Sequence, residues 1–112
     1  MNIHSVYSGG RLTVYLSGEL DQHEARSAME RLDELLDAHL PRDLVLDLGA
    51  LRFMDSSGIA LMIRLSRRMK ATGGRMWIEN PAQQPKRVID AAGIDRLIPG
   101  GGRQPVTKGG SA

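Results

Sequence analysis

The chain has 112 residues, of which 41% are hydrophobic and 25% charged, and its formal net charge at pH 7 is +2. This length fits one domain with a real core, and so small a net charge gives no reason to expect direct binding of nucleic acid. The absence of cysteine excludes disulfides and thiolate metal sites, and the three scattered histidines lack ligand spacing, so we expect no metal and no other cofactor.

The N-terminal segment is expected to form a β-hairpin. Residues 11–16 alternate apolar and polar side chains as a half-buried strand does. The Gly9-Gly10 turn before them predicts a short, weak edge strand over residues 3–7. Residues 18–21 break the alternation, so we expect the second strand to end before them.

A helix follows the hairpin. Asp21 is a natural N-cap, and Glu24, three residues on, is its capping-box partner, so the plain role of Asp21 is to start the helix. Pro41 closes this segment. The buried face is expected to carry five apolar residues at three-to-four spacing: Ala25, Met29, Leu32, Leu36 and Leu40.

Strands and helices alternate through the rest of the chain. Residues 44–48 are nearly continuous in apolar side chains, as expected for a central strand covered on more than one side. A helix over 57–71 is expected to end at Gly73-Gly74, where glycine can take the left-handed conformation. The remaining elements are a strand over 75–79, a helix over 83–92 and a last short strand over 96–98.

This order of elements predicts the fold class. Alternating strands and helices favour an α/β domain whose sheet is mostly parallel after the hairpin, with right-handed crossovers. We expect four to five strands, an N-terminal hairpin and helices packed on the sheet, all within residues 1–98. Residues 99–112 are rich in Gly, Pro and polar side chains, and we expect this C-terminal tail to be disordered.

Residues 53–58, Phe-Met-Asp-Ser-Ser-Gly, are the most informative segment of the chain. They stand between the expected central strand and an apolar helix, so the hydroxyls of Ser56 and Ser57 fall at a helix N-terminus. The first backbone N–H groups there lack partners, and the helix dipole favours negative charge. A serine in this place is either a plain helix cap or a site where phosphate can be placed and read, and the residues alone favour the cap.

The helix over 57–71 has a wide apolar arc. Its central residues are expected to face the sheet, whereas Ile59 and Ile63 lie well round from that centre. Two interpretations stay open: a neighbouring helix covers them, or they form a small docking patch beside Ser56. The arginines on the opposite face have no interleaved aromatic residues, so they indicate a solvated face rather than a nucleic-acid surface.

Several short motifs in order carry a family resemblance. They are Leu-Ser-Gly-Glu-Leu-Asp at 16–21, Leu-Asp-Leu at 46–48, the segment 53–58, Gly73-Gly74, Asn80-Pro81 and Gly93-Ile94. Over residues 3–98 the chain resembles the STAS-domain proteins of the bacterial anti-sigma-factor antagonist type. The resemblance implies a repeating strand–helix fold, in accord with the pattern above. Ala60 departs from it, because the family often has a second glycine there, but alanine still permits close approach.

The resemblance also implies a regulatory function. In this family the serine directly after the aspartate is phosphorylated, and that position here is Ser56. The kinase is the anti-sigma factor itself, a serine kinase with a histidine-kinase-like ATPase fold, and a serine phosphatase reverses the step. The unphosphorylated protein binds the anti-sigma factor and releases the sigma factor, and phosphorylation switches binding off. The expected partner-binding residues are Asp21, Asp55, Ser56, Ser57, Gly58, Ile59 and Ile63.

The residues on either side of Ser56 have expected roles of their own. Given the resemblance, Ser57 is expected to cap the helix rather than to receive phosphate. Asp55 either orients the Ser56 hydroxyl for the kinase or shapes the turn, and the sequence does not separate these two roles.

An enzyme is the hypothesis from another class, and the sequence argues against it. Residues 54–58 lack the first glycine of the Gly-x-Ser-x-Gly elbow of serine hydrolases. Gly73-Gly74 is not followed by the Lys-Ser/Thr pair of a phosphate-binding loop. We therefore expect a binding module with no catalytic residue.

A second kind of binding module remains as the alternative. Domains resembling this one also serve as constitutive docking subunits of lipid-transport ATPases or of stress-signalling assemblies, without phosphorylation. The chain has no stretch of the ~18 apolar residues that span a bilayer and no signal peptide. We therefore expect a cytoplasmic protein that reaches a membrane only through a partner.

Overall fold

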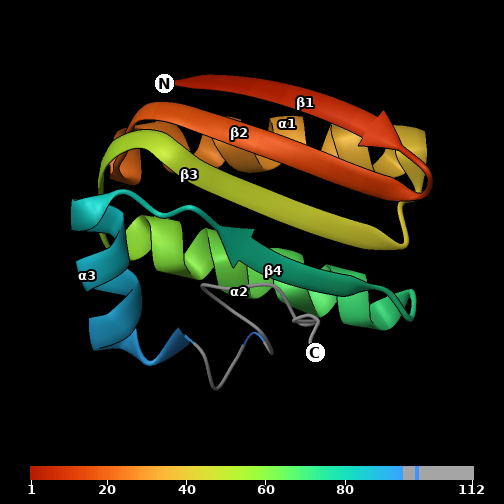
Figure 1. Cartoon of the computed structure of the whole chain (residues 1–112). Helices are drawn as coiled ribbons and strands as arrows, with labels where there is room; N and C mark the ends of the chain where they lie inside the picture. The colour runs from red at the N-terminus through yellow and green to blue at the C-terminus, as the bar shows by residue number, and fades with distance from the viewer. Residues whose placement is uncertain (95–97, 99–112) are drawn as a thin grey trace.

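Four strands form one sheet whose order follows the chain, β1-β2-β3-β4 (Figure 1). The computed structural model of the protein describes residues 1–94 and 98. The strands are β1 (Asn2–Ser8), β2 (Arg11–Leu20), β3 (Asp43–Met54) and β4 (Arg75–Glu79), and the helices are α1 (Gln22–His39), α2 (Ser56–Ala71) and α3 (Gln83–Ala92). β1 pairs antiparallel with β2, and β2, β3 and β4 are parallel. The predicted α/β fold with an N-terminal hairpin and a mostly parallel sheet is confirmed.

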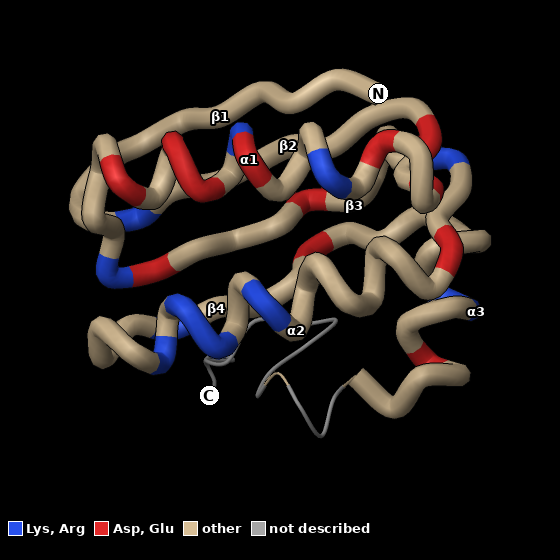
Figure 2. Tube along the Cα trace, turned by 180° about the vertical axis from the view of Figure 1, so that it is seen from behind, with Lys and Arg blue, Asp and Glu red and all other residues tan. Residues whose placement is uncertain are grey.

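The helices α1 and α2 lie side by side on one face of the sheet (Figure 1, Figure 2). α3 lies at the end of the sheet where β3 leads into α2 (Figure 1). Because alternate residues of a strand share a face, β2 and β3 each present a row of apolar side chains to the two helices. The largest of the fully buried residues in this core include Leu12, Leu16, Leu32, Leu44, Leu46, Leu48, Met62 and Leu65.

The end of α2 follows the prediction. Gly73 takes the left-handed conformation with φ of 76°. Its N–H donates to the carbonyl of Lys70 at 3.0 Å, and the N–H of Gly74 donates to the carbonyl of Met69 at 2.8 Å. This pair of bonds is a Schellman motif, which satisfies carbonyls that have no partner inside the helix.

β2 and β3 extend several residues beyond their predicted ends, and β1 is one residue longer at each end. β2 continues through Gly18 to Leu20, because two register shifts against β3, of the kind that a β-bulge produces, let the ladder go on. Gly18 has φ of 94°, so its role is to form the irregularity and not to end the strand. β3 likewise extends beyond 44–48 to Met54, and Phe53 therefore belongs to the strand.

The prediction that Leu40 lies on the buried face of the first helix is wrong. α1 ends at His39, and Leu40 is the C-cap, in the left-handed conformation with φ of 46°. Its side chain is 76% exposed. The chain reverses before Pro41, and this turns Leu40 away from the buried face of α1. Leu35, which was not predicted there, is buried on that face.

The predicted last strand and tail fall mostly outside the described residues. Residues 96 and 97 of the expected strand are not among them, and neither is the tail over 99–112. Ile98 is described, and it is a buried residue in a bend rather than in a strand.

The face of the sheet that α1 and α2 do not cover holds a buried carboxylate. Asp43, the first residue of β3, is 2% exposed. Arg11 lies 3.3 Å from its Oδ2, and Arg75 lies 3.1 Å from its Oδ1. The two ion pairs therefore join the first residues of β2, β3 and β4. The Arg11 guanidinium also lies 4.8 Å from the centre of the Trp77 ring, in a cation–π contact.

Candidate functional site

The site forms where the parallel strands β2 and β3 end at the same edge of the sheet. Their register pairs Leu20 with Met54, the last residue of each strand. The N–H of Asp55 donates to the carbonyl of Leu20 at 3.3 Å. Asp21 and Asp55, the residues that follow, therefore lie at one edge, and the carboxyl end of a parallel sheet is where α/β folds place binding residues.

Each of these aspartates starts a helix. Oδ1 of Asp21 accepts the N–H of Glu24 at 3.0 Å, which confirms the prediction of a cap on α1. The Glu24 carboxylate itself lies 3.9 Å from the amine of Met1. Oδ1 of Asp55 accepts the N–H of Ser57 at 2.8 Å and caps α2. The prediction that Ser57 caps this helix is wrong, because the aspartate before the serine pair supplies the acceptor and the helix begins one residue earlier.

Asp55 also joins the two helix starts. Its Oδ2 accepts the N–H of Gln22, the first residue of α1, at 3.2 Å. One carboxylate thus satisfies an unpaired N–H at the beginning of both helices. The positive ends of two helix dipoles therefore meet beside Asp55, and its two hydrogen bonds hold the turn.

Ser56 is the first residue of α2 and its side chain is exposed. Among residues 1–94 and 98, no group is hydrogen-bonded to its hydroxyl. Ser57, in contrast, is half-buried, and its side chain faces α1. The arrangement leaves the Ser56 hydroxyl accessible to another protein while its backbone is held in place by the cap before it.

Gly58 brings the start of α2 close to the ends of the strands. It is buried, and a Cβ atom placed on it would lie 3.0 Å from Sδ of Met54 and 3.3 Å from Cδ2 of Leu20. These distances are tighter than most side-chain contacts, so a larger residue would require the side chains of Met54 and Leu20 to move. Gly58 is thus a packing residue of the site.

Gln84 is a site residue that the sequence did not reveal. It lies in the first turn of α3, where its Oε1 accepts the N–H of Met54 at 2.8 Å and its Nε2 donates to the carbonyl of Met54 at 3.1 Å. These two bonds fix the residue directly before Asp55. No pattern in the sequence marks a glutamine at this position as a partner of a strand 30 residues earlier.

Ile59 and Ile63 lie on the same side of α2 as Ser56, because they follow it by three and seven residues. Both are half-buried and pack against the hydrophobic core. Helical spacing places them on the flank of α2 opposite the one that faces α1, and α3 contacts α2. The structure therefore groups Asp21, Asp55, Ser56, Ser57 and Gly58 at one edge. Ile59 and Ile63 continue from Ser56 along the side of α2 that faces away from α1.

A shallow hollow adjoins the two aspartates. It has a volume of about 490 Å³ and is lined by Asp21, Gln22, His23, Arg26 and Asp55. His23 and Arg26 are two further residues of the site that the sequence did not reveal. Their position in the first turns of α1, next to a capping aspartate, is the signal that could have drawn attention to them.

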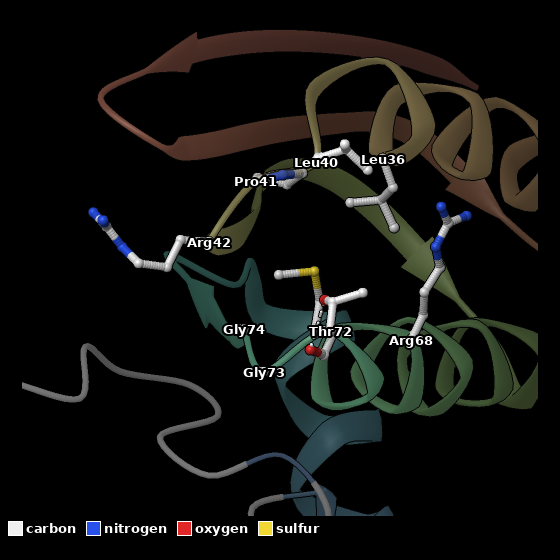
Figure 3. A pocket seen from close by; sticks show the side chains of 9 residues that line it. Leu36, Leu40, Pro41, Arg42, Arg68, Thr72, Gly73 and Gly74 are labelled. Atoms are coloured by element: carbon white, nitrogen blue, oxygen red, sulfur yellow. Dashed lines mark hydrogen bonds between the residues drawn. The ribbon is translucent and has the colours of Figure 1, made fainter.

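A second hollow lies at the other end of the helix layer, between the C-terminal ends of α1 and α2 (Figure 3). Its volume is about 400 Å³, and Leu36, Leu40, Met69 and Thr72 are among the residues that line it. The Thr72 hydroxyl is bound to the carbonyl of Met69 at 3.1 Å. This hollow is separated from Ser56 by the length of α2 and forms no part of the candidate site.

The described residues contain no helix with the length and apolar character needed to cross a bilayer.

The fold and the site define a class: a small α/β domain whose four-stranded sheet carries an exposed serine at the start of a capped helix. The model of the STAS domain family matches residues 2–106, so the chain belongs to this family. It is 30% identical over 99 residues to an anti-sigma F factor antagonist of Paenibacillus polymyxa, covering 88% of this chain and 85% of that protein.

Two solved structures show the same fold. The anti-sigma factor antagonist SpoIIAA in its unphosphorylated form has a TM-score of 0.75 and 22% identity, covering 87% of this chain and 85% of that one. The Bacillus cell fate determinant SpoIIAA in the phosphorylated form has a TM-score of 0.67 and 22% identity, covering 87% of this chain and 88% of that one.

Proposed function

We propose that this protein is an anti-sigma-factor antagonist whose partner binding is switched by phosphorylation of Ser56. The unphosphorylated protein binds an anti-sigma factor, a serine kinase with a histidine-kinase-like ATPase fold, and the sigma factor is released. Phosphorylation of Ser56 by that kinase ends the binding, and a serine phosphatase restores it. The protein acts as a binding module with no reaction of its own.

The observation that carries this proposal is the placement of Ser56. Its hydroxyl is exposed at the first residue of α2, beside a carboxylate whose two oxygens are already engaged by backbone N–H groups. Asp55 holds the turn with these two bonds, and Ser56 is the group that an approaching kinase can reach. The membership of the STAS family and the names of the relatives described above agree with this function.

The effect of a phosphate on this surface can be estimated. A phosphoserine adds about −1.5 to −2 charges at pH 7. The start of α2 should stabilise that charge by up to roughly 2 kcal/mol, so we expect the domain to stay folded. In a complex the phosphate would be held close to Asp55 and Asp21 and to acidic groups of the partner. An opposition of like charges costs several kcal/mol, and about 3 kcal/mol weakens binding more than a hundredfold.

The test is intact-mass analysis after incubation with Mg-ATP and the candidate anti-sigma kinase. We expect one phosphate on the wild type and none on Ser56→Ala. Ser57→Ala is the matched control, because it removes the neighbouring hydroxyl and leaves the cap from Asp55 unchanged, so it should still be phosphorylated. Circular dichroism of the phosphorylated protein should match that of the unmodified protein.

Two outcomes would contradict the proposal. If Ser57→Ala abolishes phosphorylation while Ser56→Ala does not, the assignment of the modified serine is wrong. If a kinase that is active on another substrate modifies neither protein, yet the chain binds a partner, constitutive docking is the function.

A further inference from the structure

A groove runs between the N-terminal halves of α1 and α2, and Ser57 lies in its wall. Its volume is about 350 Å³. The floor is apolar and comes from both helices: Ala25, Met29, Ala60 and Leu61. Two alanines among these four residues leave room for the side chains of another molecule.

The rim of the groove is positively charged. Arg26 of α1 is exposed, and no carboxylate within residues 1–94 and 98 pairs with it. Arg64 of α2 is 67% exposed, and its contact with Asp33 is long, at 3.5 Å. Asp33 is held more closely by Arg68, at 2.8 Å. Arg26 and Arg64 therefore retain charge that can pair with another molecule.

The acidic residues of α1 do not cancel this charge. Figure 2 shows the basic segments of α2 facing acidic segments of α1. Arg68 donates hydrogen bonds to both Asp33 and Asp37, and the bond to the Asp37 carboxylate raises the pKa of Arg68. These ion pairs lie toward the C-terminal half of α2, whereas the groove lies at the N-terminal half, where Arg26 and Arg64 are the nearest cations.

We propose that this groove receives an acidic amphipathic helix of the anti-sigma factor. Apolar side chains of that helix would rest on the floor, and its carboxylates would pair with Arg26 and Arg64. A helix laid in an apolar groove between two others is a common mode of protein recognition. This inference rests on the proposed function and locates the docking surface on the α1 side of α2, away from Ile59 and Ile63.

The groove adjoins the hollow beside Asp55, the residue directly before Ser56. Gln22 and Arg26 line both the groove and the hollow beside Asp21 and Asp55. A helix in the groove would therefore end next to Ser56, and its carboxylates would meet a phosphate there. This proximity gives the phosphate a direct means of repelling the docked helix.

The test uses the double variant Arg26→Glu/Arg64→Glu and the anti-sigma kinase that phosphorylates Ser56. Calorimetry should show that this variant binds the kinase at least tenfold more weakly than the wild type. The control is Arg87→Glu, which makes the same change of charge at an exposed position on α3 and should bind as the wild type does. Raising the salt concentration should weaken wild-type binding much more than that of the double variant.

A second variant tests the floor without changing charge. Ala60 is exposed on α2, so Ala60→Phe should fold normally and fill the groove. We expect it to weaken kinase binding at least tenfold, with an unchanged circular dichroism spectrum.

The outcomes separate this inference from the proposed function. Full binding by both variants would overturn the groove assignment and leave the proposed function standing. Absence of binding by the wild type would contradict both. If the chain alone self-associates in sedimentation and Ala60→Phe abolishes this, the groove holds a second copy and the inference is wrong.

Discussion

The N–H of Gln22 donates to Oδ2 of Asp55 across 3.2 Å, so the first residue of α1 is tied to the residue that starts α2. The two residues are 33 positions apart in the sequence. Neither turn can shift without breaking this bond, and the backbone before Ser56 is therefore fixed from both sides. The phosphorylation that we propose at Ser56 would thus change the charge on a rigid support.

Replacement of Asp55 by alanine should destabilise the domain. It removes the acceptor for the N–H groups of both Gln22 and Ser57, so we expect the free energy of unfolding to fall by about 1–2 kcal/mol. Urea denaturation measures this change. Asp55→Asn keeps one acceptor oxygen and should lose less than half as much. An equal loss in both variants would show that the charge, and not the cap, is what stabilises the turn.

Gln84 should stabilise the end of β3 through its two bonds to Met54. Gln84→Met keeps the side-chain length and removes both bonds, which should lower the free energy of unfolding by about 1–2 kcal/mol. Hydrogen exchange at the Met54 amide should become faster. Gln83→Met is the matched control, because Gln83 is an exposed neighbour on the same helix. A similar loss in the control would mean that methionine in this turn is the cause.

Leu40→Gly should stabilise the protein. A leucine in the left-handed conformation is strained by roughly 1 kcal/mol relative to glycine, and its side chain at this position is largely exposed. We expect a gain of about 0.5–1 kcal/mol in urea denaturation. Leu40→Ala removes the same side chain but not the strain, and should gain less. A loss of stability in Leu40→Gly would show that the side chain packs in solution.

Asp43 should contribute more to the free energy of unfolding than a carboxylate in an exposed ion pair does. Asp43→Ala leaves Arg11 and Arg75 without their shared buried carboxylate, and we expect the free energy of unfolding to fall by about 2–3 kcal/mol. This is at the low end for a buried ion pair, because both arginines are half-exposed. Glu19→Gln removes an exposed pair with Arg52 at 3.9 Å and should cost under ~0.5 kcal/mol. Thermal unfolding of both variants compares the two. Equal losses of stability in the two variants would contradict the view that burial strengthens the contribution of Asp43.

The order of strands and helices could be read from the sequence because it depends on local patterns. The alternation in β2 and the apolar run in β3 indicate strands, and Asp21 marks the start of α1. Each of these signals lies within a few residues of the element that it predicts. The family membership agreed with the same order, since its motifs occur at the junctions between elements.

The details of the site depend on contacts between distant segments, and these were not visible in the sequence. Nothing near Asp55 indicates that Gln22 will donate to it, or that Gln84 will bind Met54 from α3. The serine pair suggested a cap at Ser57, because the sequence does not show whether the aspartate or the serine faces the helix. Leu40 fitted the helical spacing and was wrongly assigned to the buried face, because periodicity does not reveal at which residue a helix ends.

The register between β2 and β3 has a consequence for variation of this protein. β2 uses 10 residues to span the same ladder for which β3 uses 12, and the two register shifts near the end of the ladder absorb the difference. A substitution in the second half of β3 keeps the spacing between Asp21 and Ser56. Deletion of one residue there would draw Ser56 back by about 3.3 Å and turn the following side chains to the opposite face. Among related sequences, insertions and deletions should therefore avoid the end of β3 even where its residues differ freely, because the number of residues sets the position of Ser56.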